Sequence, residues 1–427
     1  MNASPRIAII GAGWAGLAAA VTATQAGASV TLFEMAPRIG GRARSLPGPV
    51  GSERLDNGQH ILIGAYTATL GLMRDVGVDP DRVLERSPLS LVGPTGQGLR
   101  LPHGPAPLAF AWATLTQSDW RWRDRLALLS TALRWTLSGF RCDSRLSVAD
   151  LCHNLPPALR RDLIDPLCVA ALNTPAQEAS ASVFLRVMRD ALFSAPGAAD
   201  LLVPRVPLAE LLPEPAEAWL RQHRVVIHTG TQVRSLDELK AGIGKDGIVL
   251  ACSASEAARL AEAANGRWAR QAAAFGYEPI VTVYLDAPGA RLRVPMLSLP
   301  EGPQAPAQFA FDHGAIGSQA GRFAFVISGA RPWVERGREA IINAVLQQAR
   351  LVLSRPDGRP CELAVMHVVA EKRATFRCTP GLDRPSAQIA PGLVAAGDYV
   401  DGPYPATLEG AVRSGLGAAR LLTDSQA

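Results

Sequence analysis

The 427-residue sequence predicts an α/β fold of two parts, one built on a parallel sheet and one an α+β part. A strand–helix–strand pattern at 6–34 and a strand–helix pattern at 393–422 predict the parallel sheet. Strand-like runs between 276 and 371 predict an antiparallel sheet in the second part, and a helical region is expected up to about residue 195. Because the two patterns of the first part lie far apart, that part is expected to be discontinuous in sequence.

The first pattern carries the glycine spacing G-x-G-x-x-G directly after a short apolar run. Gly11 permits a tight turn, Gly13 allows close approach of a pyrophosphate, and Gly16 lets the helix contact the strand. The alanine-rich segment that follows and ends at Gly27 is expected to be a helix, whose N-terminus would direct its free N–H groups and positive dipole end at phosphates. This arrangement predicts a Rossmann-like dinucleotide-binding unit.

Glu34 closes the second strand at the spacing where a carboxylate accepts hydrogen bonds from a ribose diol. The competing interpretation is a membrane anchor or signal peptide, because no charged side chain occurs from Ile7 to Phe33. The glycines, the scattered polar residues and the absence of a basic leader beyond Arg6 argue against it. The dinucleotide-binding interpretation is therefore favoured.

A second glycine pair follows in the segment R-I-G-G-R. Gly40 and Gly41 offer further backbone N–H donors, and Arg38 and Arg42 offer guanidinium groups that suit a pyrophosphate. A simple NAD-binding unit does not need this element. The alternative is a glycine turn with two solvated arginines.

Two further segments combine polar and small residues. The stretch 55–66 reads L-D-N-G-Q-H-I-L-I-G-A-Y. Its histidine, His60, is either a functional residue or only a hydrogen-bonded residue of a turn. The stretch 393–411 holds a buried strand that ends at Gly397-Asp398, and a helix is expected to start near Thr407. Asp398 is alternatively the N-cap of that helix. Small residues at 410, 411, 414, 415, 417 and 418 predict close packing of the helix.

Together these motifs resemble the flavin-dependent amine oxidase and phytoene desaturase superfamily, which favours FAD as the cofactor. Residues 55–66, 167–190 (with A-A-L-N-T) and 393–422 look like the hydroxysqualene dehydroxylases, also called squalene-associated FAD-dependent desaturases. The resemblance implies a discontinuous FAD-binding domain of the GR2 type at 1–85, 205–265 and 385–427. It implies a substrate-binding domain at 86–204 and 266–384.

The resemblance also implies roles for individual residues. The segment 57–60 would pass near the flavin ring, Asp398 would bind the ribityl chain, and the helix start near Thr407 would face the pyrimidine edge. The backbone of Val233 would contact the adenine, although Val233 is equally well an ordinary residue of a strand expected at 232–236. The FAD-binding residues so implied are Gly11, Gly13, Trp14, Ala15, Gly16, Glu34, Arg38, Gly40, Gly41, Arg42, Asn57, Gly58, Gln59, His60, Val233, Gly397, Asp398, Thr407 and Leu408.

The resemblance implies reduction of hydroxysqualene to squalene by hydride from reduced FAD, in squalene and hopanoid biosynthesis. An electron donor that the motifs do not specify must reduce the flavin. The cofactor motifs leave an isoprenoid desaturase or an amine oxidase open, and a non-catalytic flavin-bound lipid carrier is the alternative from another class. Expulsion of the hydroxyl as water requires a proton donor, and the candidates are Asp401, His60 and Tyr404 in that order. We expect apolar surroundings to keep Asp401 protonated.

The composition excludes several classes of protein. Charged residues make up 19% of the chain, and the net charge of +5 comes from dispersed arginines, so nucleic-acid binding is not expected. The six cysteines show no metal-ligand spacing, which predicts reduced core thiols and no metal site. No apolar run is an uninterrupted membrane-spanning segment. A cytoplasmic location is expected.

One stretch after Asp119 suggests contact with a membrane surface. Apolar residues recur there at helical spacing among basic ones; they are Trp122, Leu126, Leu129 and Leu133, with Arg121, Arg123, Arg125 and Arg134 nearby. Such a helix lies on the cytoplasmic face of a membrane in one interpretation and packs into the core in the other. A second long helix is expected at 334–353, and a hairpin at 89–101.

Overall fold

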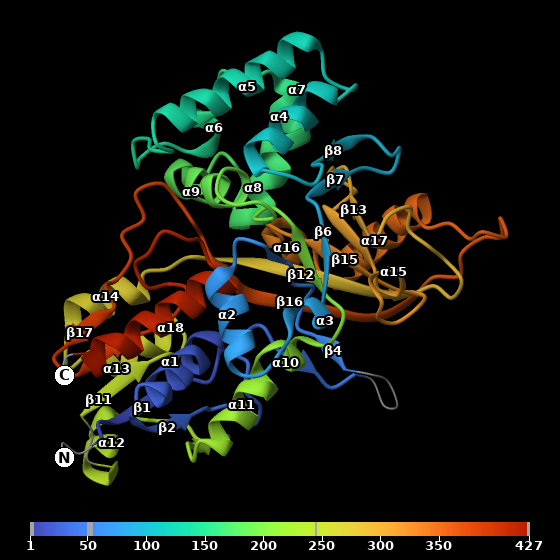
Figure 1. Ribbon diagram of the computed structural model, residues 1–427. Coiled ribbons are helices and arrows are strands. Elements are labelled where there is room, and N and C mark those ends of the chain that lie inside the picture. The colour runs from blue at the N-terminus through green and yellow to red at the C-terminus, as the bar shows by residue number, and fades with distance from the viewer. Residues whose placement is uncertain (1–3, 49–53, 244–245, 425–427) are drawn as a thin grey trace.

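The computed structural model describes residues 4–48, 54–243 and 246–424. Figure 1 shows three regions stacked along the molecule: a sheet with packed helices at the lower end, a second sheet across the middle, and a helical region at the top. The strands of the lower sheet come from the beginning, the middle and the end of the chain. The α/β fold with a discontinuous sheet is therefore confirmed.

The lower sheet has six strands in the order β10-β2-β1-β11-β18-β17. The first five are parallel, and β17 is antiparallel to β18 at the edge. The bounds are Arg6–Ile10 (β1), Ser29–Phe33 (β2), Val226–His228 (β10), Gly247–Leu250 (β11), Gln388–Ala390 (β17) and Leu393–Ala395 (β18).

Strand β1 is apolar and buried from Ile7 to Ile10 because both faces of the sheet are covered there. Ile7 and Ile9 belong to one core with α1 and α18, and Ala8 and Ile10 belong to another that includes α13 and α14. The helices around this sheet are α1 (Trp14–Gln25), α2 (Thr67–Asp75), α10 (Leu208–Leu211), α11 (Pro213–Gln222), α12 (Leu236–Ile243), α13 (Ala254–Ala261), α14 (Gly266–Ala273) and α18 (Leu408–Thr423).

The close packing expected of the C-terminal helix is confirmed where α18 crosses α1. A Cβ atom at Gly415 would lie 2.1 Å from the carbonyl oxygen of Ala15 and 2.9 Å from Cβ of Ala18. No side chain fits at that distance, so glycine is required where the two backbones meet.

The middle sheet is antiparallel, as predicted, with the order β13-β14-β15-β12-β16. Its strands are β12 (Tyr277–Asp286), β13 (Met296–Ser298), β14 (Phe309–Asp312), β15 (Arg322–Ile327) and β16 (Ala364–Phe376). Val281, Val283 and Leu285 share a core with residues of α17 (Arg338–Val352). The alternate residues Thr282 and Tyr284 contact the backbone of Gln59 and Asp56. One face of this sheet therefore supports the polar segment that follows the second glycine loop.

The helical region begins after the β7–β8 hairpin (Ser90–Val92 and Gly98–Arg100), which confirms the hairpin prediction. Its helices are α4 (Ala106–Thr116), α5 (Trp122–Leu137), α6 (Val148–Leu151), α7 (Pro157–Leu159), α8 (Asp165–Leu172) and α9 (Ala181–Leu192), with a π-helical turn η1 (Arg160–Ile164) between α7 and α8. Asn173 ends α8 with a φ of 48° and donates to Thr375 Oγ1 at 2.9 Å, while its Oδ1 accepts from Gly329 N at 2.7 Å. The A-A-L-N-T motif thus ties this region to the middle sheet.

Two predicted elements are wrong. Residues 232–235 form no strand, and α12 begins at Leu236. The expected helix at 334–353 is two helices, α16 (Arg331–Arg336) and α17, which are separated by Gly337 with a φ of 91°. The remaining elements are β3 (Ser45–Leu46), β4 (Leu55–Asp56), β5 (Leu62–Ile63), β6 (Leu84–Ser87), β9 (Leu201–Pro204), α3 (Pro80–Val83) and α15 (His313–Ile316).

Candidate cofactor-binding site

Two glycine loops contact each other at the carboxyl ends of the parallel strands. Gly11 has a φ of 105°, and a Cβ there would lie 2.5 Å from the carbonyl oxygen of Ala251. A Cβ at Gly16 would lie 1.9 Å from the carbonyl oxygen of Gly11. Gly40 N donates to Ala12 O at 2.8 Å, so the R-I-G-G-R segment lies on the first loop. Because α1 begins beside both loops, its free N–H groups form an anion-binding site there.

Glu34 lies next to the first glycine loop, as predicted. Its carboxylate accepts hydrogen bonds from Ala12 N at 2.7 Å and from Ala36 N at 2.8 Å. The side chain is half-buried, so its remaining lone pairs are available to a ligand. Arg38, in contrast, is exposed.

Arg42 and Asp398 connect the second glycine loop to the end of β18. Arg42 Nη2 donates to Asp398 Oδ1 at 2.6 Å, and Arg42 Nη1 donates to Ala374 O at 3.0 Å. The buried Asp398 carboxylate raises the pKa of Arg42 above its usual value. Asn57 Nδ2 donates to the Arg42 carbonyl at 3.0 Å and to Glu371 at 3.1 Å. Four segments distant in sequence therefore converge on one charged cluster.

The loop between β18 and α18 is held by Arg384, which the sequence motifs did not identify. Its guanidinium donates to five backbone carbonyls of this loop, those of Asp398 (2.5 Å), Tyr399 (3.4 Å), Val400, Gly402 (2.9 Å) and Tyr404 (2.7 Å). Burial lowers the pKa of Arg384. An isolated arginine in an irregular segment carries no recognisable pattern, so only the fold shows this role.

Helix α18 begins directly after Thr407, as the sequence predicted. Thr407 is its N-cap, and Thr407 Oγ1 accepts from Gly410 N at 3.1 Å, so Asp398 is not the N-cap. Leu408 is the first helical residue, and Gly397 N donates to Ser414 Oγ at 3.0 Å. Glu409 is fully buried and accepts from Thr69 N at 2.9 Å, which ties α18 to the start of α2.

Tyr399 has a buried hydroxyl group without a hydrogen-bond partner among the described residues. The side chain is 3% exposed, and burial holds its pKa well above the usual range. It lies near Cys252, Asp398 and Arg42, and the Arg42 guanidinium partly opposes the effect of burial on its pKa. A buried hydroxyl without a partner costs free energy, so a polar ligand that reaches it would be bound more tightly. The glycine cradle, the α1 N-terminus and this hydroxyl all fit a dinucleotide.

The segment 57–60 forms a polar cluster under the middle sheet. His60 Nδ1 lies 3.0 Å from the carbonyl oxygen of Gly58, which can only accept, so His60 carries its proton on Nδ1 and leaves Nε2 as an acceptor. Burial lowers the pKa of His60. Gln59 Oε1 lies 3.0 Å from Nε2 of His313, whose pKa burial lowers to about 4. His313 was not predicted, because its position next to Gln59 arises only when the middle sheet forms.

The structure gives the candidate acids different surroundings. Asp401 is exposed, so the apolar environment expected for it is absent and that reason for placing it first is wrong. Its backbone N–H donates to Pro385 O at 2.8 Å. Tyr404 donates its hydroxyl proton to Asp190 Oδ2 at 2.7 Å, and the guanidinium groups of Arg186 and Arg413 lie 5.1 and 5.4 Å from its ring centroid. Tyr404, Asp190 and Arg413 line a groove of about 180 Å³.

Val233 lies in the irregular segment that precedes α12. Its side chain is buried, and its carbonyl oxygen accepts from Arg259 Nη2 at 3.1 Å. The six cysteines are free, and three of them are buried. Among the described residues no group of side chains forms a metal site, and no helix is long and apolar enough to cross a membrane.

Known proteins resemble this chain along nearly its whole length. The family model of flavin containing amine oxidoreductases matches residues 14–423. Hydroxysqualene dehydroxylases of Zymomonas mobilis and Rhodopseudomonas palustris are both 29% identical, over 97% and 98% of this chain and 98% of each relative. A probable zeta-carotene desaturase of Synechococcus elongatus is 25% identical over 99% of both chains.

Solved structures share the fold at low sequence identity. An oxidoreductase from Methanosarcina mazei has a TM-score of 0.69 at 15% identity, over 96% of this chain and 99% of that chain. Cyclohexylamine oxidase from Brevibacterium oxydans has a TM-score of 0.66 at 19% identity over 99% of both. The glycine cradle and these similarities agree, and the chain belongs to the flavin containing amine oxidoreductase family and is an FAD-dependent oxidoreductase.

Proposed function

We propose that this oxidoreductase removes the hydroxyl group of hydroxysqualene to form squalene, in squalene and hopanoid biosynthesis. The observation that carries the proposal is the similarity, over at least 97% of the chain, to three proteins named hydroxysqualene dehydroxylase. When bound, reduced FAD would supply the hydride for this reaction. The chain's own residues must hold the cofactor, orient the carbinol and provide a proton.

Each part of the glycine-rich site has a proposed task. Glu34 accepts hydrogen bonds from the adenosine ribose, and the N-terminus of α1, the glycine loops and Arg42 hold the pyrophosphate. Asp398 holds the ribityl chain, and the positive end of α18 at Thr407 and Leu408 stabilises negative charge on the pyrimidine edge. The backbone of Val233 contacts the adenine, Arg38 assists at the phosphates, and Asn57, Gly58, Gln59 and His60 line the ring side.

The proton donor is proposed to be Asp401. Tyr404 already donates its hydroxyl proton to Asp190, so it is less suited to protonate the substrate. His60 donates its Nδ1 proton to the carbonyl oxygen of Gly58, and its Nε2 can only accept. Because Asp401 is exposed, the isoprenoid chain of the substrate has to cover its carboxyl group when the substrate binds. His60 Nε2 is then suited to accept from the carbinol O–H and orient it.

A single-turnover experiment tests this function. Photoreduced protein mixed anaerobically with hydroxysqualene should lose its reduced-flavin spectrum and yield squalene. Asp401→Asn should retain FAD and slow reoxidation at least about 100-fold, since general acid catalysis typically contributes 10²–10⁴. If no squalene forms with the wild type, the proposed reaction is wrong; if Asp401→Asn reoxidises at the wild-type rate, Asp401 is not the acid.

The similarity to the probable zeta-carotene desaturase of Synechococcus elongatus supports a second candidate function, that of an isoprenoid desaturase. A desaturase moves hydride from substrate to flavin, so the oxidised protein would be bleached anaerobically by a carotene such as zeta-carotene. Bleaching by the carotene without turnover of hydroxysqualene would replace the proposed function by this one.

Tyr399→Phe should weaken FAD binding while leaving the fold intact. The ring keeps its contact with Phe275, and only the unpartnered hydroxyl is removed. A hydrogen bond to a charged group contributes about 1.5–3 kcal/mol, so a phosphate contact predicts roughly a 10- to 100-fold higher Kd. Titration of apoprotein with FAD, followed by flavin fluorescence, measures this change. An unchanged Kd together with a raised melting temperature would show that the hydroxyl does not reach the cofactor.

A further inference from the structure

The large apolar side chains that remain exposed are concentrated on α4 and α5. Seven of the eleven such side chains among the described residues lie on these two helices: Leu108, Trp112, Leu115, Trp122, Leu126, Leu133 and Leu137. We call these seven residues the α4–α5 apolar surface. A concentration of this kind on a folded protein marks an interaction site.

On α5 the exposed apolar residues form one stripe opposite the packed face. Trp122, Leu126, Leu133 and Leu137 fall within about 60° of the helix circumference at 3.6 residues per turn. The buried residues Leu128, Thr131 and Ala132 lie on the other side of the helix. Core packing, the alternative for the stripe after Asp119, is therefore wrong for its exposed members, Trp122, Leu126 and Leu133.

Helix α4 has the same organisation and no charged residue at all. Leu108, Trp112 and Leu115 are exposed, while Phe110 and Ala113 are buried. Arg125 joins the two helices, because its Nη1 donates to Leu115 O at 2.8 Å and its Nε donates to Trp120 O at 3.0 Å. Arg125 therefore ties the start of α5 to the C-terminal end of α4, so that the two helices that carry the stripes are held together.

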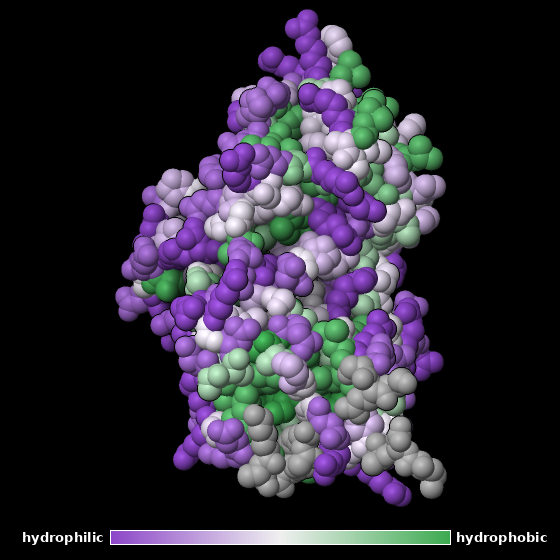
Figure 2. All heavy atoms as spheres, turned by 90° about the vertical axis from the view of Figure 1, so that its left-hand side faces the viewer, coloured by the Kyte–Doolittle hydropathy of each residue, from purple (hydrophilic) through white to green (hydrophobic). Residues whose placement is uncertain are grey.

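Positive charge borders this surface. Arg121, Arg123 and Arg134 are exposed, and the guanidinium of Arg123 lies 5.5 Å from the ring centroid of Trp122. None of the three forms an ion pair with a carboxylate in the described part of the chain. In Figure 2 the upper end of the molecule, which α4 and α5 form in Figure 1, carries green apolar atoms beside purple polar ones.

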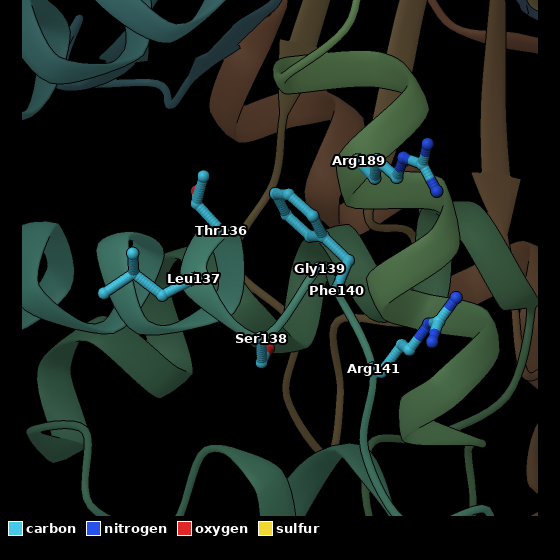
Figure 3. Close-up of a pocket in the computed structure, with 7 residues that line it drawn as sticks. All are labelled: Thr136, Leu137, Ser138, Gly139, Phe140, Arg141 and Arg189. Atoms are coloured by element: carbon cyan, nitrogen blue, oxygen red, sulfur yellow. The ribbon is translucent and has the colours of Figure 1, made fainter.

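An open groove of about 580 Å³ lies at the C-terminal end of the α5 stripe. Figure 3 shows Arg141, from the loop after α5, and Arg189, from α9, on the same side of the groove, with Leu137 on the other. Both arginines are exposed, and neither has a carboxylate partner among the described residues. An apolar stripe that ends at two free guanidinium groups suits an amphiphile with an anionic head.

We propose that the α4–α5 apolar surface docks into the interfacial layer of a bilayer that contains anionic lipids. The leucines enter the acyl boundary, Trp112 and Trp122 lie at headgroup depth, and the bordering arginines pair with lipid phosphates. A second copy of the chain is a poorer occupant, because a two-fold contact through this surface would bring the arginine margins together. Docking goes beyond the proposed reaction, since it gives the enzyme access to any substrate dissolved in the bilayer.

Vesicle sedimentation of the holoprotein tests the proposal. Wild type should bind phosphatidylcholine vesicles that contain phosphatidylglycerol, and added salt should weaken this binding. Trp122→Ser/Leu126→Ser and Leu133→Ser/Leu137→Ser should each bind at least about ten-fold more weakly, because each removes two inserting side chains. The matched control is Leu351→Ser/Leu421→Ser, which changes two exposed leucines of α17 and α18 and should bind as wild type does.

The arginine groove is tested separately with Arg141→Gln/Arg189→Gln. This variant should lose several-fold in affinity for anionic vesicles and bind pure phosphatidylcholine as wild type does. Equal sedimentation of wild type and both stripe variants would overturn the proposal. So would a wild-type dimer in size-exclusion chromatography that the stripe variants convert to monomer, because the surface would then be an interface between copies.

Discussion

The Glu34→Arg protein is expected to leave purification without the visible absorption of flavin. In the wild type the carboxylate accepts from the backbone N–H groups of Ala12 and Ala36 beside the first glycine loop. Arginine has five donors and no acceptor, so neither N–H group keeps its partner and no lone pair is left for a ribose hydroxyl. The added cation also lies close to the positive N-terminus of α1, which disfavours it.

Two controls separate loss of the cofactor from loss of the fold. Glu34→Gln keeps one acceptor oxygen and should bind FAD at least about ten-fold more weakly while unfolding near the wild-type temperature. Glu335→Arg makes the same charge change at an exposed position of α16 and should retain flavin fully. A Glu34→Arg protein with the wild-type flavin spectrum would remove Glu34 from the site.

The sequence predicted the parts of the site that depend on local pattern. Gly11, Gly16 and Glu34 follow from a strand–turn–helix order in which sterics admit few residues, and the structure brings them together as expected. The small residues of α18 were predictable in the same way, since Gly415 is required where two helix backbones meet. Local geometry restricts residue type strongly at such positions.

Long-range contacts explain what the sequence did not show. Glu409 is buried because α18 meets the start of α2, and His313 meets Gln59 only across the middle sheet. Asp401 was expected in an apolar site because it lies just before the helix that the resemblance places at the flavin, yet it is exposed. The break at Gly337 was missed because apolar periodicity continues on both sides of it, and a single positive φ ends the helix. Periodicity predicts elements but not the partners that their side chains find.

Arg384→Met should both destabilise the protein and release part of its flavin. One half-buried guanidinium serves five carbonyls between Asp398 and Tyr404, in the loop that joins Asp398, the proposed ribityl ligand, to the start of α18. Methionine approximates the aliphatic part of the side chain and removes every donor, so these carbonyls must find water or remain unpaired. We expect a loss of about 3 kcal/mol or more in the free energy of unfolding, measured by urea denaturation of the apoprotein.

FAD affinity distinguishes a role of Arg384 in positioning this loop from a role in the stability of the whole protein. Lysine keeps the charge but places three donors on one atom, which cannot span carbonyls along a whole loop. Arg384→Lys should therefore regain part of the stability while its FAD affinity stays at least about ten-fold below wild type, because Asp398 and the start of α18 remain misplaced. The exposed Arg420→Met on α18 is the matched control and should change neither quantity. Wild-type FAD affinity in both Arg384 variants would mean that the loop keeps its conformation without the guanidinium, and that Asp398 is positioned by Arg42 instead.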